Sequence, residues 1–190
     1  TLEGTLHLTD LQGSLRHMPL SGHGEMQFHG SEVQIPAMIL KSGGSTVSLQ
    51  GSATDRVEFL LSLHSGNVGE LWPGASGLLD LKGRVHGTVQ RPAFTLQLGA
   101  DRLRVDQTSF DRLKVTGQGV LAADGEFQVD AQLNKLTHGD VQVPQAFLQA
   151  QGTPAHHSLK INGSTQHATA AGEVLGSLQQ SHWPATLQNI

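Results

Sequence analysis

Residues 77–89 read Gly-Leu-Leu-Asp-Leu-Lys-Gly-Arg-Val-His-Gly-Thr-Val, and this stretch decides the fold class. From Gly77 onward every second residue is Gly, Leu or Val, whereas the intervening residues after Leu78 are Asp, Lys, Arg, His and Thr. A period of two residues is typical of a β-strand, because successive side chains point to opposite faces of the sheet. The stretch therefore predicts a strand with one apolar face and one polar face.

The same alternation recurs along the whole chain. It is strong at 57–63, 94–98, 127–133 and 159–163, and weaker at 2–8, 11–15, 26–28, 33–39, 47–51, 113–119 and 146–152. Turn sequences such as Gly43-Gly44 and Asp124-Gly125 separate these segments, which predicts about a dozen antiparallel strands of about 7 to 9 residues each. Only 67–72 is suited to a helical turn, which Pro73 would end. We expect an all-β fold with one short helix.

Composition excludes several classes of function. The chain has 190 residues with 12 Lys and Arg against 16 Asp and Glu, and no basic cluster of the kind that binds nucleic acid. No apolar run approaches the roughly 18 residues of a membrane-spanning helix. The absence of cysteine excludes a disulfide framework. The sequence predicts neither nucleic acid as a partner nor a membrane span within these residues.

An antiparallel sheet with one apolar face must cover that face with helices, with a second sheet, by curling on itself, or with a ligand. Helical patterns are scarce, so a β-sandwich or barrel and a curved half-pipe remain as alternatives. The chain has only 6 Phe, 2 Trp and no Tyr, whereas a sandwich core usually depends on large aromatic residues.

We therefore expect a long, curved antiparallel sheet of the half-pipe or β-taco type, with an apolar concave groove that suits a flexible acyl chain. The alternation assigns fourteen residues to its lining: Val57, Phe59, Leu61, Leu79, Leu81, Val85, Phe94, Leu96, Leu98, Phe127, Val129, Leu133, Leu159 and Ile161.

Histidine is the one enriched reactive residue, with 11 copies. His7, His64 and His86 fall in the outward, polar phase of their strands, and His156 and His157 are adjacent, so that their rings would point to opposite faces. No HExxH or equivalent metal-binding spacing occurs. We expect no metal site, no cofactor and no catalytic residue, and hence a protein that is not an enzyme.

Several motifs resemble the TamB family of bacterial envelope proteins. The stretch 70–88, Glu-Leu-Trp-Pro-Gly-Ala-Ser-Gly-Leu-Leu-Asp-Leu-Lys-Gly-Arg-Val-His-Gly-Thr, is similar to the family's short helix ending in Pro-Gly, followed by its Gly-x-Leu-x-Leu-x-Gly-x-Val-x-Gly-Thr strands. The alternating 113–119, the Gly-Thr-Pro-Ala-His-His stretch at 152–157, and the ending from Gly172 to Trp183 and Leu187 resemble further family elements. Ala185 stands where the family usually has Gly. Other AsmA-like proteins share this strand pattern.

The resemblance implies a periplasmic protein anchored in the inner membrane by an N-terminal helix. It implies phospholipid movement between the two membranes, assembly of outer-membrane proteins, and the outer-membrane barrel protein TamA as a partner. Because Thr1 already lies in an alternating pattern, we interpret residues 1–190 as a single β-groove segment of a longer, repeat-like chain. The alternative hypotheses are a chaperone-like scaffold that binds strands of nascent outer-membrane proteins, and a plain β-sandwich surface domain.

Overall fold

A computed structural model describes residues 3–164, 169–176 and 186–189 as a single sheet of 13 strands. The strands are β1 (Glu3–Leu15), β2 (Met18–His29), β3 (Glu32–Ser42), β4 (Ser45–Ala53), β5 (Arg56–Ser65), β6 (Ala75–Thr88), β7 (Pro92–Val105), β8 (Thr108–Val120), β9 (Phe127–His138), β10 (Val141–Gly152), β11 (His157–Ser164), β12 (Thr169–Gly176) and β13 (Thr186–Asn189). One 3₁₀ turn, η1 (Val68–Glu70), lies between β5 and β6.

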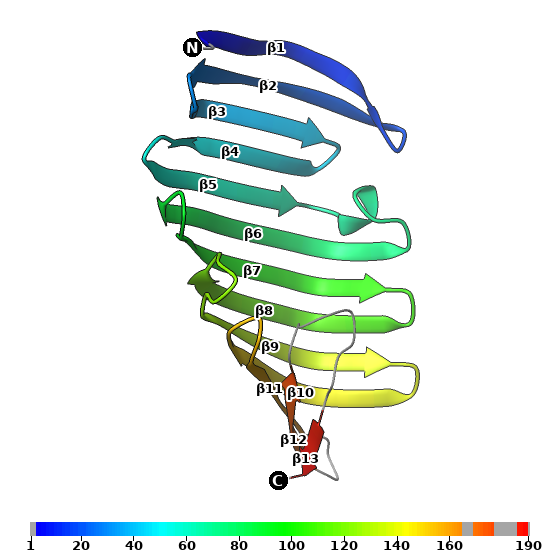
Figure 1. The fold of residues 1–190 in the computed structure, drawn as a ribbon. Helices are drawn as coiled ribbons and strands as arrows, with labels where there is room; N and C mark the ends of the chain where they lie inside the picture. The colour runs from blue at the N-terminus through cyan, green and yellow to red at the C-terminus, as the bar shows by residue number, and fades with distance from the viewer. Residues whose placement is uncertain (1–2, 165–168, 177–185, 190) are drawn as a thin grey trace.

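The strands pair in chain order, each antiparallel to the one before it. Figure 1 shows this order running down the sheet, which turns along its length so that β11 to β13 lie at a steep angle to β1. Short turns make the order possible. Arg16 and His17, between β1 and β2, have φ of 51° and 68°, as a two-residue hairpin turn with the right-handed twist of its strands requires.

The sheet is open. Its accessible surface is 12466 Å², against about 8800 Å² for a compact protein of this mass. Four hydrophobic residues, Ile35, Val68, Ala100 and Ala146, make up the buried apolar set among the described residues. No second layer of strands covers the sheet within the described ranges. These observations confirm the prediction of an all-β, open antiparallel sheet with one short helix.

Strand lengths differ from the prediction of 7 to 9 residues, because nine of the 13 strands have 10 or more residues. β6 and β7 have 14 residues each, which corresponds to about 46 Å. Positions 2–8 and 11–15 were predicted as separate strands, but most of both lie in β1, which continues through an irregularity between Leu8 and Leu11. Likewise 26–28 is only part of β2. Arg102 in β7 and Lys135 in β9 have φ of 51° and 48°. These left-handed residues interrupt the alternation of side chains, but both strands continue past them.

Candidate functional site

Strand register carries one row of apolar residues across most of the sheet. Cross-strand partners lie on the same face, and successive pairings connect one residue from each of β1 to β12. The row consists of Leu11, Gly22, Leu40, Val47, Leu63, Leu81, Leu98, Val115, Ala131, Leu148, Ile161 and Gly172. Ten of these residues are apolar and two are glycine, so a continuous apolar strip runs perpendicular to the strands. We call the side of the sheet that carries this row the apolar face.

The fourteen residues predicted to line a groove all lie on this apolar face. Leu81, Leu98 and Ile161 belong to the row itself. The others occupy parallel rows two or more residues away along the strands: Leu61, Leu96, Val129 and Leu159; Phe59, Val85, Phe94 and Phe127; Val57; and Leu79 and Leu133. The register therefore brings together side chains that are up to a hundred residues apart in sequence.

None of the fourteen side chains is fully buried. Leu61 and Ile161 are each 40% exposed, whereas a leucine or isoleucine in a sandwich core would be enclosed by a second layer. Two small side chains of the same face, Ala100 at 3% and Ala146 at 8% exposed, are buried. The side chains of the apolar face are thus partly open to solvent rather than enclosed by a second layer.

Aromatic residues face glycines at one end of the strands. Phe59 pairs with Gly51 and Phe127 with Gly119. A Cβ atom added at Gly51 would lie 2.6 Å from Cδ1 of Phe59, and one at Gly119 would lie 2.8 Å from Cβ of Phe127. The glycines leave room for side chains of the neighbouring strand to lie close to the backbone.

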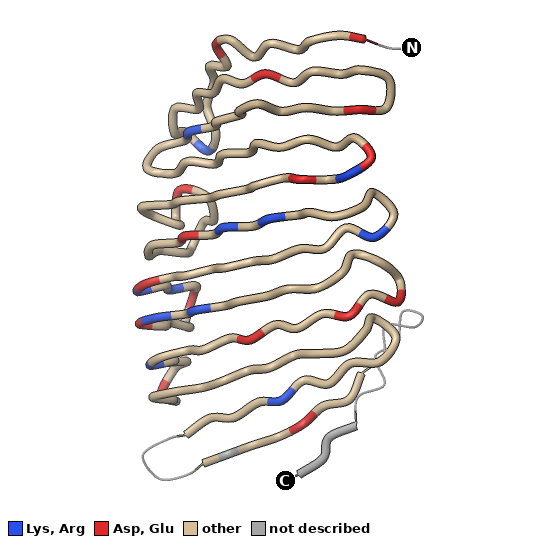
Figure 2. The backbone as a smooth tube through the Cα atoms, turned by 90° about the vertical axis from the view of Figure 1, so that its left-hand side faces the viewer, with Lys and Arg blue, Asp and Glu red and all other residues tan. Residues whose placement is uncertain are grey.

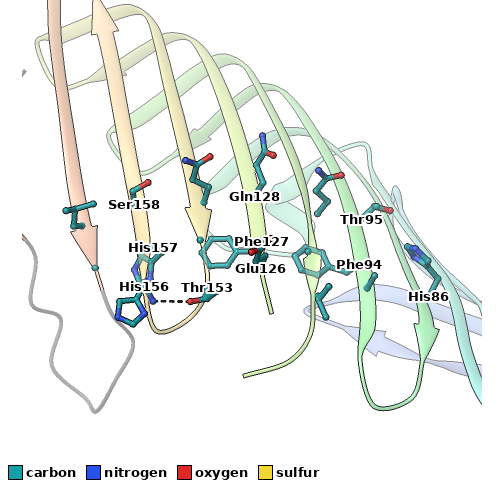
Figure 3. Close-up of a pocket in the computed structure, with 18 residues that line it drawn as sticks. His86, Phe94, Thr95, Glu126, Phe127, Gln128, Thr153, His156, His157 and Ser158 are labelled. Carbon is teal, nitrogen blue, oxygen red and sulfur yellow. Dashed lines mark hydrogen bonds between the residues drawn. The ribbon is translucent and has the colours of Figure 1, made fainter. Parts of the chain in front are cut away.

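His157 takes part in the same arrangement, although the sequence pattern did not indicate it. It pairs with Gly152 and Gly176, and its ring centroid lies 6.2 Å from that of Phe127, across the strand that carries Gly152. A hollow of about 1160 Å³ extends along this end from His86 on β6 to Gly176 on β12. Figure 3 shows Phe94 and Phe127 in this hollow, and Gln128 and Ser158 also line it.

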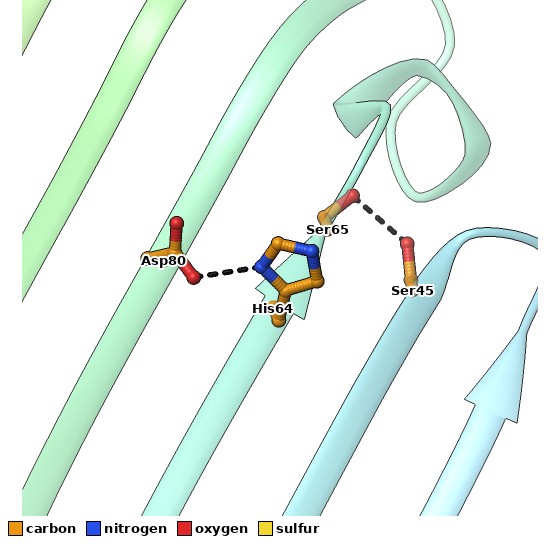
Figure 4. A network of polar contacts seen from close by, with 4 residues as sticks. All are labelled: Ser45, His64, Ser65 and Asp80. Atoms are coloured by element: carbon orange, nitrogen blue, oxygen red, sulfur yellow. Dashed lines mark hydrogen bonds and ion pairs between the residues drawn. The ribbon is translucent and has the colours of Figure 1, made fainter.

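The opposite end of β3 to β5 is polar and covered. Ser45 and Ser65 take the places of apolar residues in their row, are 3% and 0% exposed, and lie 2.8 Å apart between their Oγ atoms (Figure 4). The η1 segment lies beside them, where the Glu70 carboxylate accepts a hydrogen bond of 2.7 Å from Gly44 N. The Arg16 side chain donates another, of 2.6 Å, to Leu71 O. Nothing in the strand alternation predicted this tethered corner, because its contacts join turns.

The other face of the sheet is polar and carries paired charges. The Arg84 guanidinium donates hydrogen bonds of 2.6 and 3.1 Å to the Glu58 carboxylate, and this pairing holds the pKa of Glu58 below its usual value. His64 Nδ1 lies 2.7 Å from Asp80 Oδ1 (Figure 4). Figure 2 shows Lys, Arg, Asp and Glu dispersed over the strands and turns rather than gathered in one block.

Histidines are dispersed in the same way. His7 lies 3.6 Å from Glu25, and His64 bonds to Asp80 on another part of the polar face. Within the described ranges, no group of three or more His, Asp or Glu residues is placed to hold a metal ion. His86 also lies in the polar phase, paired with Glu58 in register, but its Nδ1 atom is buried without a hydrogen-bond partner.

Comparison with known proteins gives one family match. The model of the family described as TamB, N-terminal domain, matches residues 2–190. No solved structure matches the chain. Trp183 and Ala185, which entered the resemblance noted from sequence, lie outside the described residues. The described part of the chain has no helix that is long and apolar enough to cross a membrane.

Proposed function

Because the chain belongs to the TamB family of envelope proteins, we propose that its apolar face binds phospholipid acyl chains and forms part of a path for phospholipid between the inner and outer membranes. The observation that carries the proposal is the uninterrupted row of leucine, valine, isoleucine, alanine and glycine across β1 to β12. An acyl chain lying along such a row meets apolar side chains at ten of its twelve strands, and neighbouring strands are about 4.8 Å apart.

The energetic scale supports this role. Each methylene removed from water contributes about 0.8 kcal/mol, so a chain of about sixteen carbons gains on the order of 10 kcal/mol in a dry groove. Partial exposure of Leu61 and Ile161 lowers that gain in free energy. The weaker binding would allow a bound acyl chain to dissociate from the surface. A conduit needs sites that hold acyl chains without trapping them. We therefore propose a non-enzymatic role in which residues 1–190 form one groove segment of a longer, periplasm-spanning protein.

The family also supports the wider setting of this proposal. We place the protein in the periplasm, anchored in the inner membrane through another part of the chain, and acting with the outer-membrane barrel protein TamA to support outer-membrane protein assembly. Phospholipid acyl chains and TamA are thus the proposed partners.

Site-specific photo-crosslinking in the bacterial envelope tests the lipid proposal. A photoreactive residue at Leu81 or Leu96, both on the apolar face, should capture phospholipid, whereas the same residue at Arg84 or His86, in the polar phase, should not. Equal capture at positions 81 and 84 would show that lipid does not select the apolar face.

A second candidate function is a chaperone-like scaffold for strands of nascent outer-membrane proteins. The observation favouring it is that large side chains of the apolar face, such as Leu6 at 59% exposed, are open to a partner, because exposed apolar surface can also hold the apolar side chains of another protein's strand. A photoreactive residue at position 6 that captured an outer-membrane protein, together with no lipid at position 81, would favour this function over lipid binding.

A further inference from the structure

Three adjoining hollows lie on the polar face of the sheet between β6 and β11. Their volumes are about 400, 260 and 390 Å³, and Thr116 on β8 lines all of them. At the margins, β6 contributes Asp80 and Lys82 and β11 contributes Asn162, all in the polar phase of their strands. The hollows therefore open on the polar face. We call them together the Thr116 depression.

A glycine accounts for part of the hollow shape. Gly99 lies in the polar phase of β7, between Asp80 on β6 and Lys114 on β8. A Cβ atom added at Gly99 would have nothing within 4 Å. The missing side chain leaves open space between longer side chains on both sides of it.

An aromatic ring with polar neighbours lies in the same depression. Phe147 on β10 is 44% exposed, and the register places Gln132 on one side of it and Asn162 on the other. Lys114 lies next in the row, opposite Gln132, so the four side chains span about 14 Å across four strands. Within the described part of the chain, the side chains of Lys114, Gln132 and Asn162 have no hydrogen-bond or ion-pair partner. Their polar groups are available to a ligand.

Asp130 adds a fixed acceptor beside this row. Its two carboxylate oxygens accept hydrogen bonds of 2.8 Å from the Gln128 amide and 2.9 Å from the Gln149 amide. An ionised carboxylate has about four acceptor positions, so two amide bonds orient the group without using all of them. Asp130 can therefore still accept a hydrogen bond from a ligand hydroxyl.

The formal charges around the depression cancel. It is lined by three cationic and three anionic side chains: Lys82, Arg112, Lys114, Asp80, Asp101 and Asp130. Two of these six are already paired, because Arg112 donates a hydrogen bond of 2.9 Å to Asp101. The balance favours an uncharged ligand that both donates and accepts hydrogen bonds.

We propose that the Thr116 depression binds a neutral glycan, with one pyranose ring packed against the ring of Phe147. The C–H groups on the face of a pyranose carry partial positive charge and pack on the negative face of an aromatic ring. Sugar hydroxyl groups both donate and accept hydrogen bonds, as the amides of Gln132 and Asn162 do. The adjoining hollows then hold successive sugar units of one chain.

Other polymers fit the depression less well. An extended peptide commonly binds a sheet by pairing with an edge strand, whereas each strand from β6 to β11 is already paired on both sides. An acyl chain cannot satisfy the polar groups of Lys114 and Asp130. The proposal does not rest on lipid binding, because the depression lies on the face opposite the apolar rows.

Saturation-transfer difference NMR tests the proposal with three neutral tetrasaccharides: tetra-N-acetylchitotetraose, cellotetraose and maltotetraose. At least one should receive saturation from the natural protein, and titration then gives its dissociation constant. Phe147→Ala should raise this constant about tenfold, equivalent to ~1.4 kcal/mol, because the stacked ring is lost. Phe147→Trp should keep the affinity, because an aromatic face remains.

Leu60→Ala is the matched control. Leu60 is also exposed on the polar face, at 42%, but lies on β5 outside the depression, so its removal should leave the dissociation constant unchanged. If Phe147→Ala does not fold, Phe147→Leu replaces it, since leucine keeps an apolar side chain but has no ring. Circular dichroism checks the folding of each variant.

Three results would overturn the proposal. The first is saturation transfer to none of the three tetrasaccharides at millimolar concentration. The second is an equal loss of affinity in Leu60→Ala, or unchanged affinity in a folded Phe147→Ala or Phe147→Leu. The third is tighter binding of a neutral peptide of serine and glutamine than of any tetrasaccharide, which would assign the depression to a polypeptide.

Discussion

Adjacent leucines of β5 offer a direct test of what the apolar face does. Leu60 and Leu61 are 42% and 40% exposed, yet they lie on opposite faces: Leu61 pairs with Gly83 in the apolar rows, and Leu60 pairs with Arg84 on the polar face. Replacing either by aspartate makes the same chemical change at nearly the same depth. The two variants should therefore differ in lipid binding far more than in stability.

The expected loss of stability follows from the exposure. Fully burying a leucine contributes about 1.5–3 kcal/mol, so a side chain that is 40% exposed contributes about 1–2 kcal/mol. For a protein of this size, that loss lowers the melting temperature by about 2–8 °C. Water reaches the introduced carboxylate on an open face, so no large additional desolvation cost arises. Both Leu60→Asp and Leu61→Asp should remain folded, as judged by thermal unfolding followed with circular dichroism.

Lipid binding should separate the two variants. Mass spectrometry of protein purified without detergent should show phospholipid with the natural protein and with Leu60→Asp, but much less with Leu61→Asp, because an acyl chain cannot solvate a charge. Failure of Leu61→Asp to fold while Leu60→Asp folds normally would mean that Leu61 belongs to an enclosed core. Equal lipid content in both folded variants would refute acyl-chain binding at this face.

Three further predictions concern shape, charge pairing and glycine. Small-angle scattering should give a radius of gyration clearly above the roughly 16 Å of a compact domain of this length, and a value near that figure would contradict an open sheet. The hydrogen bond from Arg84 lowers the pKa of Glu58. The pair therefore stabilises the fold at pH values above the unfolded-state pKa of Glu58, and this stabilisation is lost as the pH falls through the lower pKa of the folded state. The melting temperature of Glu58→Gln should accordingly lie slightly below that of the natural protein at pH 7 and converge with it in acid; a gap that persisted at pH 2 would assign the effect to another cause. Gly119→Ala should lower stability, because its Cβ would lie 2.7 Å from Glu126 O. Gly99→Ala, whose Cβ would have nothing within 4 Å, should be neutral or stabilising by up to about 1 kcal/mol. Similar melting temperatures for the two variants would refute this reasoning.

The alternation of residue types was sufficient to predict the fold class and to place the fourteen residues on one face of the sheet; their lining of a lipid groove stays a prediction. Parity along one strand assigned Leu81 and Val85 to the same side, and the antiparallel register then aligned them with Leu63 and Phe59 of β5. This alternation is informative here because every connection between the described strands joins neighbours in the sheet, so an error in assigning one strand does not propagate to the next.

The alternation of residue types did not predict the structure where the backbone departs from the extended conformation. The left-handed residue Arg102 is an ordinary arginine in sequence, and nothing in its neighbours indicates that β7 continues past it. The contact between Glu70 and Gly44 joins two turns that are 26 residues apart, and depends on how the sheet edge curves. His157 was taken as one of two adjacent rings on opposite faces, but its approach to Phe127 across Gly152 becomes visible only once the strand register is known.

The strictly sequential order of the strands affects how such a protein can reach its folded state. Each strand needs only the preceding strand as its pairing partner, so the entropy lost in closing each connection stays small. Folding can therefore begin without contacts between distant parts of the chain. Hairpins can therefore form one after another as the polypeptide is synthesised, with the N-terminal strands already paired while later ones are still unfolded. A polypeptide assembled in this manner can also gain or lose a hairpin without disturbing the rest, so the length of the sheet can change through duplication or deletion of strand pairs.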